Sequence, residues 1–427
     1  MSRILNRQGK NKFTNTGQVI VILLVFVMSF ITCIDHAEKN STGAAGERFE
    51  DFAGSKACES CHKNIYDSVL LTAHFKTLQT AEEKNIMGSF TNGNNTFYYR
   101  PNLKIVMEKR DSGFYQVVYF NGEEKKAMKI DMVIGSGVMG QSFLSWRKDK
   151  LFQLPITFFT AANQWSNSPG LPLNKVVIDK PVTSRCMECH STFAQTIAGP
   201  PLEPMDFDHQ KIMYEIGCEK CHGAGQKHIA YQVQNPTVKT GKYIVNPAKL
   251  SRQQQLDACA LCHGGNIKKT QPSFGFTAGK NLADYFVIEK GNDEVVKNGN
   301  VDVHGNNYGL LIASKCFKMS ADLTCNTCHN THENQRGKKE LFSQKCINCH
   351  NTKAADFKTP AHVQVTDIEK NCIDCHMPAQ PSKSIAVKLQ DEDVLRASLI
   401  RTHFISIYAT ENKINKPLKN GKKLVKK

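Results

Sequence analysis

The sequence predicts a mainly α-helical and irregular fold in which something other than aliphatic side chains fills much of the core. The chain has 427 residues, enough for two or more domains, but only 40% are hydrophobic and 16 are cysteines. Most cysteines lie in the second half, with too little chain between them for long helices or strands. The expected exception is a small antiparallel β meander near residues 95–135, where short aromatic and β-branched runs alternate with turn signals.

Fourteen cysteines form seven CxxC pairs, and a histidine directly follows each pair. CxxCH is the attachment signature of c-type haem: the two thiols form thioethers on one porphyrin edge, and the histidine is the proximal iron ligand. Zinc ribbons and redox-active CxxC pairs do not require that histidine. The sequence therefore predicts seven covalently bound haem c groups as the core. The attachment cysteines are Cys58, Cys61, Cys186, Cys189, Cys218, Cys221, Cys259, Cys262, Cys325, Cys328, Cys346, Cys349, Cys372 and Cys375. The proximal ligands are His62, His190, His222, His263, His329, His350 and His376.

The sixth ligand of each iron decides between electron transfer and catalysis. Eight histidines remain outside the motifs, and His36 lies in a polar tether that makes it a poor ligand. Seven candidate distal ligands are left for seven irons. They are His74, His209, His228, His304, His332, His362 and His403.

Three of these candidates need comment. His209 and His304 have an acidic residue just upstream, which could mark a hydrogen-bonded pair instead of a ligand. His332 lies three residues after His329, so on a helical turn both face nearly the same side. His332 cannot reach the distal side of the haem that His329 ligates, and we expect it to cap a neighbouring haem.

The N-terminus predicts export. Four basic residues precede an apolar run at 19–31, which is short for a membrane span and typical of a signal peptide. Cys33 follows where a bacterial lipoprotein carries its acylated cysteine, although Phe30 and Thr32 depart from the usual lipobox. The alternative is an uncleaved anchor helix. Both place the mature chain in the periplasm or cell envelope, attached to a membrane.

These features predict five segments. They are a signal peptide (1–32), a lipidated tether (33–54), a one-haem N-terminal domain with the β meander (55–180), a six-haem domain (181–410) and a basic disordered tail (411–427). The tail could instead dock to an acidic partner or to anionic headgroups.

The net charge of +16 does not indicate nucleic-acid binding. Residues 1–32 carry four of these charges, which leaves +12 on the mature chain (16 − 4). Seven haems bring about fourteen propionate charges, offset in part by about seven ferric centres. The basic excess is therefore interpreted as a counter-charge for the propionates.

Several stretches resemble the cytochrome c-554 and c-552-type multihaem domain family, related to the hydroxylamine oxidoreductase and multihaem nitrite reductase group. They are GSKACESCHKNIYDSVLLTAHFKTL, CEKCHGAGQKH, VNPAKL, LTCNTCHNTH and NCIDCHMP, within about residues 54–410. The resemblance implies an extracytoplasmic electron carrier and supports His74, His228, His332 and His403 as distal ligands. The chain lacks a CxxCK motif and has seven motifs, not eight, which departs from the catalytic relatives.

Three functional hypotheses follow. The leading one is a lipid-anchored heptahaem carrier in a respiratory chain, between a membrane quinol oxidising system and a downstream reductase or cytochrome. The alternative is an enzyme in which one open-face haem acts on a small nitrogen or sulfur compound, with His209 or His304 as acid or base. The third is a subunit that docks a partner through the meander. The unpaired Cys316 is expected to be a buried thiol near a haem edge, or else a reactive or iron-ligating thiolate.

Overall fold

The computed structural model describes residues 46–288, 301–350, 370–390, 392 and 394–408. The expected signal peptide, Cys33, His36, His362 and the basic tail lie outside these residues. The described residues from Glu47 onwards belong to one compact unit. Among the described residues, no helix has both the length and the apolar character needed to cross a bilayer.

The expectation of a mainly helical fold is wrong, because helix and strand each account for 28% of the structure. The helices are α2 (Ser55–Val69), α3 (Ser184–His190), α4 (Cys218–His222), α5 (Gln226–Gln234), α6 (Arg252–His263), α8 (Asn307–Ala313), α9 (Lys315–Met319), α10 (Lys339–Ile347) and α12 (Cys372–His376). The strands of the larger sheets are β1 (Leu78–Thr80), β2 (Thr96–Arg100), β3 (Leu103–Arg110), β4 (Gly113–Phe120), β5 (Glu123–Ile130), β6 (Met132–Ile134), β7 (Gly140–Arg147), β8 (Lys150–Gln153), β9 (Ile156–Phe159), β10 (Gln164–Asn167), β11 (Lys180–Pro181), β12 (Phe193–Ala198) and β13 (Asp206–Met213). Two further hairpins pair β14 (Lys268–Lys269) with β15 (Phe286–Val287) and β16 (Ala379–Lys388) with β17 (Leu395–Arg401).

Strands β2 to β5 form a four-stranded antiparallel meander at 96–130, where the sequence predicts one. Its last hairpin turns at Asn121 and Gly122, which both have positive φ, 52° and 82°. An Asn-Gly pair in this conformation matches the twist of the flanking strands, so the turn sets their register.

The second sheet has nine antiparallel strands, with the path β1-β6-β7-β8-β13-β12 and with β9, β10 and β11 paired at its side. Asp206 of β13 pairs with Lys150 of β8, so the sheet crosses the expected domain boundary at residue 180. The division into a one-haem and a six-haem domain stays a prediction.

Two apolar clusters hold the sheets together without any prosthetic group. The first joins the meander to the nine-stranded sheet around Ile105, Met107 and Phe143, which are all 0% exposed. The second packs the other part of the sheet against Met187, between the cysteines of the motif at 186–190. Haem alone is therefore not the core.

The nine-stranded sheet escaped prediction because its strands lack clean apolar alternation. Its interior holds polar groups that bond to one another, as Ser142 and Thr157 do at 2.9 Å between their hydroxyl oxygens. Strand β13 reads DFDHQKIM, and only two of its side chains are buried. Period-two hydrophobicity is the main signal of a half-buried strand, and here it is missing.

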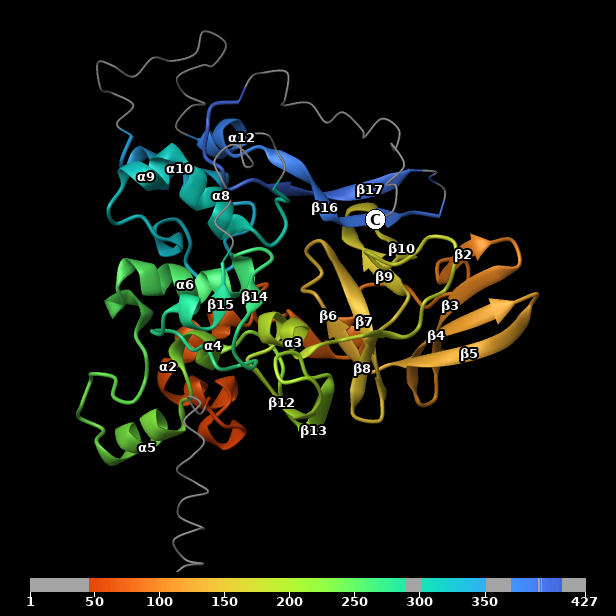
Figure 1. Ribbon diagram of the computed structural model, residues 1–427, viewed down its shortest axis with the longest axis horizontal. Coiled ribbons are helices and arrows are strands. Elements are labelled where there is room, and N and C mark those ends of the chain that lie inside the picture. The colour runs from red at the N-terminus through yellow and green to blue at the C-terminus, as the bar shows by residue number, and fades with distance from the viewer. Residues whose placement is uncertain (1–45, 289–300, 351–369, 391, 393, 409–427) are drawn as a thin grey trace, which may run out of the picture. The chain divides into compact units, whose positions relative to one another are not determined.

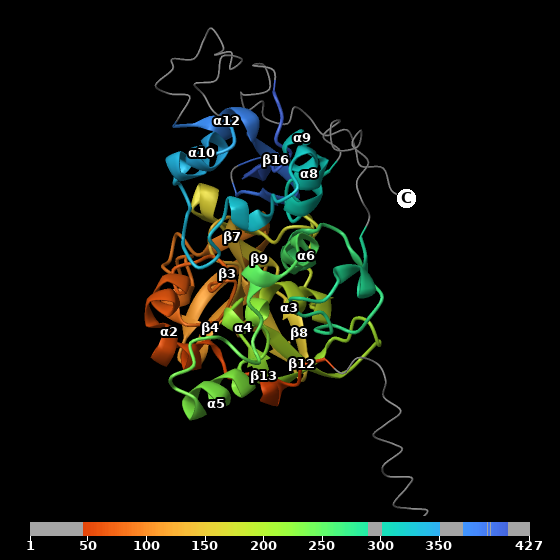
Figure 2. The ribbon, with the colours of Figure 1, turned by 90° about the vertical axis from the view of Figure 1, so that its left-hand side faces the viewer.

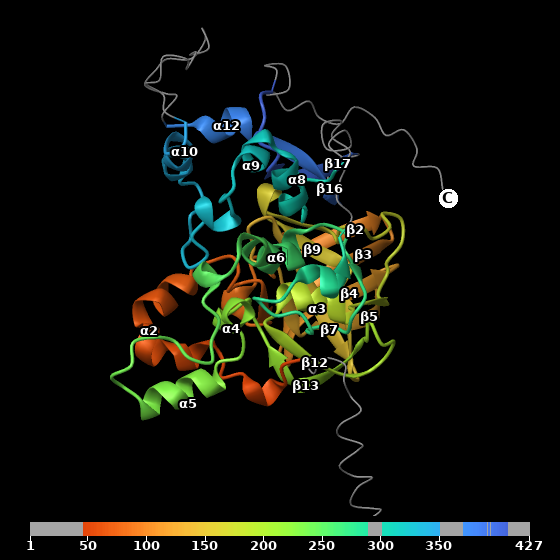
Figure 3. The same ribbon diagram turned by 60° about the vertical axis from the view of Figure 1, so that its left-hand side comes forward.

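The helices lie to one side of these strands within the same unit (Figure 1). Figure 2 brings that side to the front, with α2, α4, α5 and α6 in view. Helix α5 lies beside α2 in all three ribbon views, including Figure 3. The CxxCH motifs from residue 58 to 376 therefore occupy a helical layer against an ordinary β core.

Replacing Phe143 tests whether the β core is self-supporting. We expect Phe143→Ala to lower the free energy of unfolding by about 3–5 kcal/mol, because it leaves a cavity among fully buried side chains. Guanidinium unfolding followed by far-UV circular dichroism measures the effect. Ile197→Ala, at a side chain that is 59% exposed, is the control and should change the value by less than about 0.5 kcal/mol. Equal effects would contradict the packing described.

Candidate functional site

The CxxCH motifs lie on short helical turns. Four end an α-helix or fill one (α3, α4, α6 and α12), and the motif at 325–329 begins with the 3-10 turn Cys325–Thr327. Residues three apart on a turn face the same side, so both thiols of a motif point towards one edge of a bound group. At His62 the backbone leaves helical geometry (φ −120°, ψ 39°), which turns its imidazole out of the line of α2.

The cysteines are available for thioether bonds. The structure joins none of the fifteen cysteines that it describes in a disulfide. Within the described ranges, no three Cys, His, Asp or Glu side chains gather as a metal ion would require. Two thiols three residues apart with a histidine directly after them are the donor set that haem c attachment uses.

Three pairs of histidine rings lie with their centroids 6.0 to 6.2 Å apart. Each pair joins one CxxCH histidine to one histidine outside the motifs. The pairs are His263 with His74, His222 with His332, and His329 with His403. The structure therefore brings His74, His332 and His403 to motifs far away in the sequence.

A separation of this size is what two axial imidazoles on one iron need. An imidazole nitrogen lies about 2 Å from a bound first-row metal, so two rings on opposite sides have centroids about 6 Å apart. Ordinary aromatic packing covers about 4.5–7 Å and would also allow these distances. Packing does not explain why every pair combines one motif histidine with one outside histidine.

His304 lies near His190 and also near His263. Burial, with a smaller contribution from the nearby His304, lowers the pKa of His190 to about 4. Burial also lowers the pKa of His263 and of His403 to about 4. These imidazoles are neutral at pH 7, which is the form that ligates iron. Asp302 accepts the backbone N–H of His304 at 3.2 Å, so this carboxylate bonds the main chain.

Backbone carbonyls orient three of the imidazoles. A ligating histidine usually donates its other ring N–H to such a group, which fixes its tautomer and leaves Nε2 for the metal. The Nδ1 contacts are 2.8 Å from His222 to Val245, 3.0 Å from His228 to Lys242 and 2.9 Å from His376 to Ser406. His228 thus has the geometry of a ligand, and its helix α5 lies beside α2, which carries His62 (Figure 3).

His209 has the opposite arrangement. Its Nε2 lies 3.0 Å from the carbonyl oxygen of Lys148, and the ring stacks on Trp146 with centroids 3.7 Å apart. Asp149 lies 3.6 Å from the same nitrogen. The nitrogen that iron would use is therefore occupied, and the structure places His209 on strand β13 and not with a CxxCH histidine.

Each CxxCH motif lies next to particular other motifs. Thiols from different motifs are in contact in four places: Cys58 with Cys218, Cys189 with Cys262, Cys259 with Cys325, and Cys346 with Cys372. The elements that carry these cysteines pack against each other at the same four junctions. The ring of Phe342, on α10, lies 5.2 Å from that of His329 and links the motifs at 325 and 346.

The sequence analysis missed the acidic residues inside the motifs. Four motifs hold an acid between their two cysteines. Three of these acids, Glu188, Glu219 and Asp374, bond distant segments. The fourth, Glu59, bonds only nearby lysines. The Glu219 carboxylate accepts the backbone N–H of Ala53 and of Gly54 at 2.8 Å, which fastens the motif at 218–222 to the start of α2. An acid between paired cysteines is the signal that could have identified them.

Two further groups lie beside the motifs. Glu215 is hydrogen-bonded by the hydroxyl of Ser55 at 3.2 Å, and burial raises its pKa to about 7. Burial, with the nearby Cys349, raises the pKa of the unpaired Cys316, which is therefore a protonated thiol at neutral pH.

Two comparisons with known proteins give a match. The family model described as "Cytochrome c554 and c-prime" matches residues 161–223. The crystal structure of the outer cell wall cytochrome OcwA matches with a TM-score of 0.51 and 17% identity, over 83% of this chain and 79% of that chain. No curated protein matches. The family model covers residues 161–223 alone, and at 17% identity the structural match shows a similar fold.

Glu215 gives a prediction about pH. Its pKa is raised from 4.5 to about 7 in the folded protein, so the folded state holds the proton more tightly and stability falls as pH rises through this window. Glu215→Gln should therefore raise the free energy of unfolding at about pH 8, by up to about 3 kcal/mol, and change it little at about pH 4. Thermal unfolding at both pH values measures this. The exposed Glu50→Gln is the control, and a gain that is equal at both pH values would contradict the account.

Proposed function

We propose that this chain is a heptahaem c-type cytochrome that transfers electrons in a respiratory chain outside the cytoplasm. The observation that carries the proposal is the pairing of CxxCH histidines with outside histidines about 6 Å away. Bound haem c would supply one-electron redox chemistry. Two imidazoles on one iron keep its ligand set unchanged between oxidation states, which suits electron transfer better than catalysis.

The residues that would hold the haems follow from the contacts. The seven cysteine pairs attach the porphyrins, and the histidine after each pair is the proximal ligand. We assign His304 to the motif at 186–190, His332 to 218–222, His74 to 259–263 and His403 to 325–329. His228 is assigned to the motif at 58–62, because α5 lies beside α2.

The contacts between motifs support a branched order of redox centres. The motif at 58–62 adjoins 218–222, and 259–263 adjoins both 186–190 and 325–329. His332 follows the motif at 325–329 and pairs with His222, which connects the two groups. Phe342 continues the order from 325–329 towards the last two motifs. This order has three ends, at the motif 58–62, at the motif 186–190 and at the last two motifs, and electrons would enter at one end and leave at another.

A second candidate function rests on His209. With its Nε2 bonded to Lys148, six outside histidines remain for seven irons, apart from His36 in the expected tether. The five assignments above and His362 leave either the motif at 346–350 or that at 372–376 without a distal histidine. A haem with an open face could reduce or oxidise a small nitrogen or sulfur compound.

Location and partners belong to the same proposal. The expected signal peptide and the lipidated Cys33 would place the protein on the outer side of a membrane, and its match to an outer cell wall cytochrome supports an envelope location. Its partners would be a membrane quinol oxidising system and a downstream reductase or cytochrome.

Paired substitutions test the ligand assignment. His332→Ala should convert one low-spin ferric haem to high-spin, because it removes the sixth ligand from one iron, and low-temperature EPR of the oxidised protein measures this. His209→Ala is the matched control and should leave the EPR spectrum unchanged. A high-spin signal from His209→Ala, or none from His332→Ala, would refute the assignment.

Carbon monoxide tests the second candidate. We expect the reduced protein to bind CO at no more than one of its seven haems, since the assignment leaves at most one iron without a distal histidine. CO difference spectra, calibrated against total haem, give the stoichiometry. An adduct at one haem would favour the enzyme, the absence of an adduct would favour the carrier, and binding at several haems would contradict the ligand count.

A further inference from the structure

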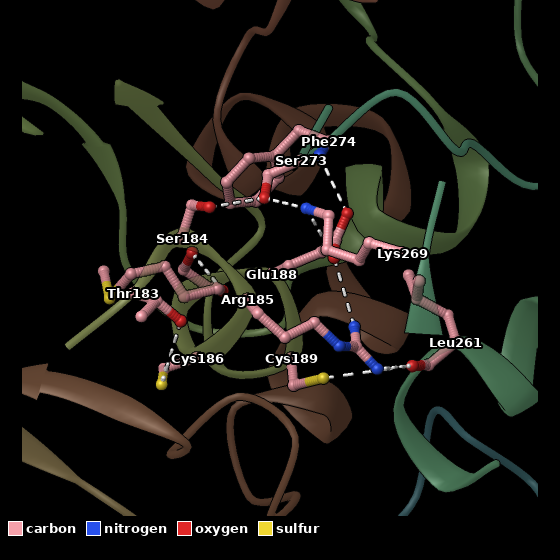
Figure 4. Close-up of polar contacts among 12 residues, drawn as sticks. Thr183, Ser184, Arg185, Cys186, Glu188, Cys189, Leu261, Lys269, Ser273 and Phe274 are labelled. Atoms are coloured by element: carbon pink, nitrogen blue, oxygen red, sulfur yellow. Dashed lines mark hydrogen bonds and ion pairs between the residues drawn. The ribbon is translucent and has the colours of Figure 1, made fainter. Parts of the chain in front are cut away.

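Three charged side chains form a buried cluster between two CxxCH motifs. Arg185 directly precedes Cys186, Glu188 lies between Cys186 and Cys189, and Lys269 follows the motif at 259–263 (Figure 4). The side chains of Glu188 and Lys269 are only 1% and 2% exposed. Burying ionic groups so deeply is costly unless each one is bonded, so their contacts need an explanation.

Arg185 bonds both motifs at once. Its Nη1 donates to the Glu188 carboxylate at 3.1 Å, within its own motif. Its Nη2 donates at 2.7 Å to the carbonyl oxygen of Leu261, which lies between Cys259 and Cys262. The guanidinium also lies over the ring of Phe286, 5.0 Å from its centroid. The planar guanidinium donates to two acceptors in a fixed geometry. A lysine ammonium on its flexible side chain cannot fix both acceptors as rigidly.

The rest of the cluster holds Glu188 in place. Its second carboxylate oxygen accepts the backbone N–H of Phe274 at 2.8 Å. Lys269 lies 3.7 Å from the carboxylate and also bonds the hydroxyl of Ser273, which in turn bonds that of Ser184 at 2.6 Å. Figure 4 shows these bonds as one connected network. Because Glu188 is held in place, it fixes the guanidinium of Arg185 in the position from which it bonds Leu261.

Charged side chains also bond backbone groups at other places where two motifs are in contact. Arg252, at the start of α6, donates from Nε to the carbonyl oxygen of Leu323 at 3.0 Å, two residues before Cys325. Glu219 bonds the backbone before α2, as described above. Three of the four junctions between motifs thus have a charged side chain bonded to the backbone of the neighbouring segment.

We propose that Arg185 is a positioning residue that fixes the motif at 186–190 against the motif at 259–263 and so sets the electron exchange between their haems. The inference rests on the proposed function, because it requires haem at both motifs. Arg185 and Lys269 against Glu188 also leave one excess positive charge in the cluster (1 + 1 − 1 = 1). A buried positive charge favours the reduced form of a nearby haem and raises its reduction potential.

The test uses Arg185→Gln and Arg185→Lys in the full-length holoprotein. Arg185→Gln removes the charge and the fork, so it should lower the reduction potential of one haem and weaken the magnetic coupling of one haem pair in EPR. Arg185→Lys keeps the charge but not both bonds, so it should preserve the potential and still weaken the coupling. Redox titration followed by optical and EPR spectra gives both readouts.

Arg147→Gln is the matched control. Arg147 is also half-buried and donates to a backbone carbonyl, that of Ile178, but it lies in the nine-stranded sheet with its guanidinium over the ring of Phe152. It should change neither readout. The proposal is overturned if Arg185→Gln and Arg185→Lys both match the wild type, or if Arg147→Gln has the same effects. Should Arg185→Gln fail to incorporate haem, Arg185→Lys alone decides. A wild-type protein without covalent haem would refute the proposed function instead.

Discussion

In the proposed function two imidazoles on one iron would face each other across about 6 Å, and this spacing would determine the arrangement of the helical layer. Three pairs of histidine rings meet it, and each combines residues that are far apart in the sequence. His74 reaches a motif almost two hundred residues further on, and His332 reaches back to His222. Each such pair links two distant segments of the chain, as a disulfide does in a small secreted domain.

The β layer gives this arrangement a rigid support. Ile105, Met107 and Phe143 pack into a conventional core, and Met187 extends such packing to a cysteine motif. Charged side chains then bond one motif to the next, as Arg185 does to the backbone of Leu261. Apolar burial supplies the stability of the chain, while directed hydrogen bonds determine how the motifs lie relative to one another.

The sequence was informative where the chemistry demands adjacent residues. The CxxCH motifs and the Asn121-Gly122 hairpin depend on neighbours in the chain, so their patterns could be recognised. Pairing between distant segments could not be. Strand β13 pairs with β8 at Asp206 and Lys150, and the local sequence of neither strand predicts this pairing. For the same reason the sequence ranked His209 with His304, although only a tertiary contact, the bond from His209 to Lys148, distinguishes them.

The central claim is that imidazoles from distant segments share iron atoms. A crystal structure of the holoprotein with anomalous diffraction collected at the iron edge tests it most directly. The account predicts iron between His222 and His332, between His263 and His74, between His329 and His403, and between His190 and His304. Iron with only its CxxCH histidine at these sites, or irons paired with other histidines, would contradict it.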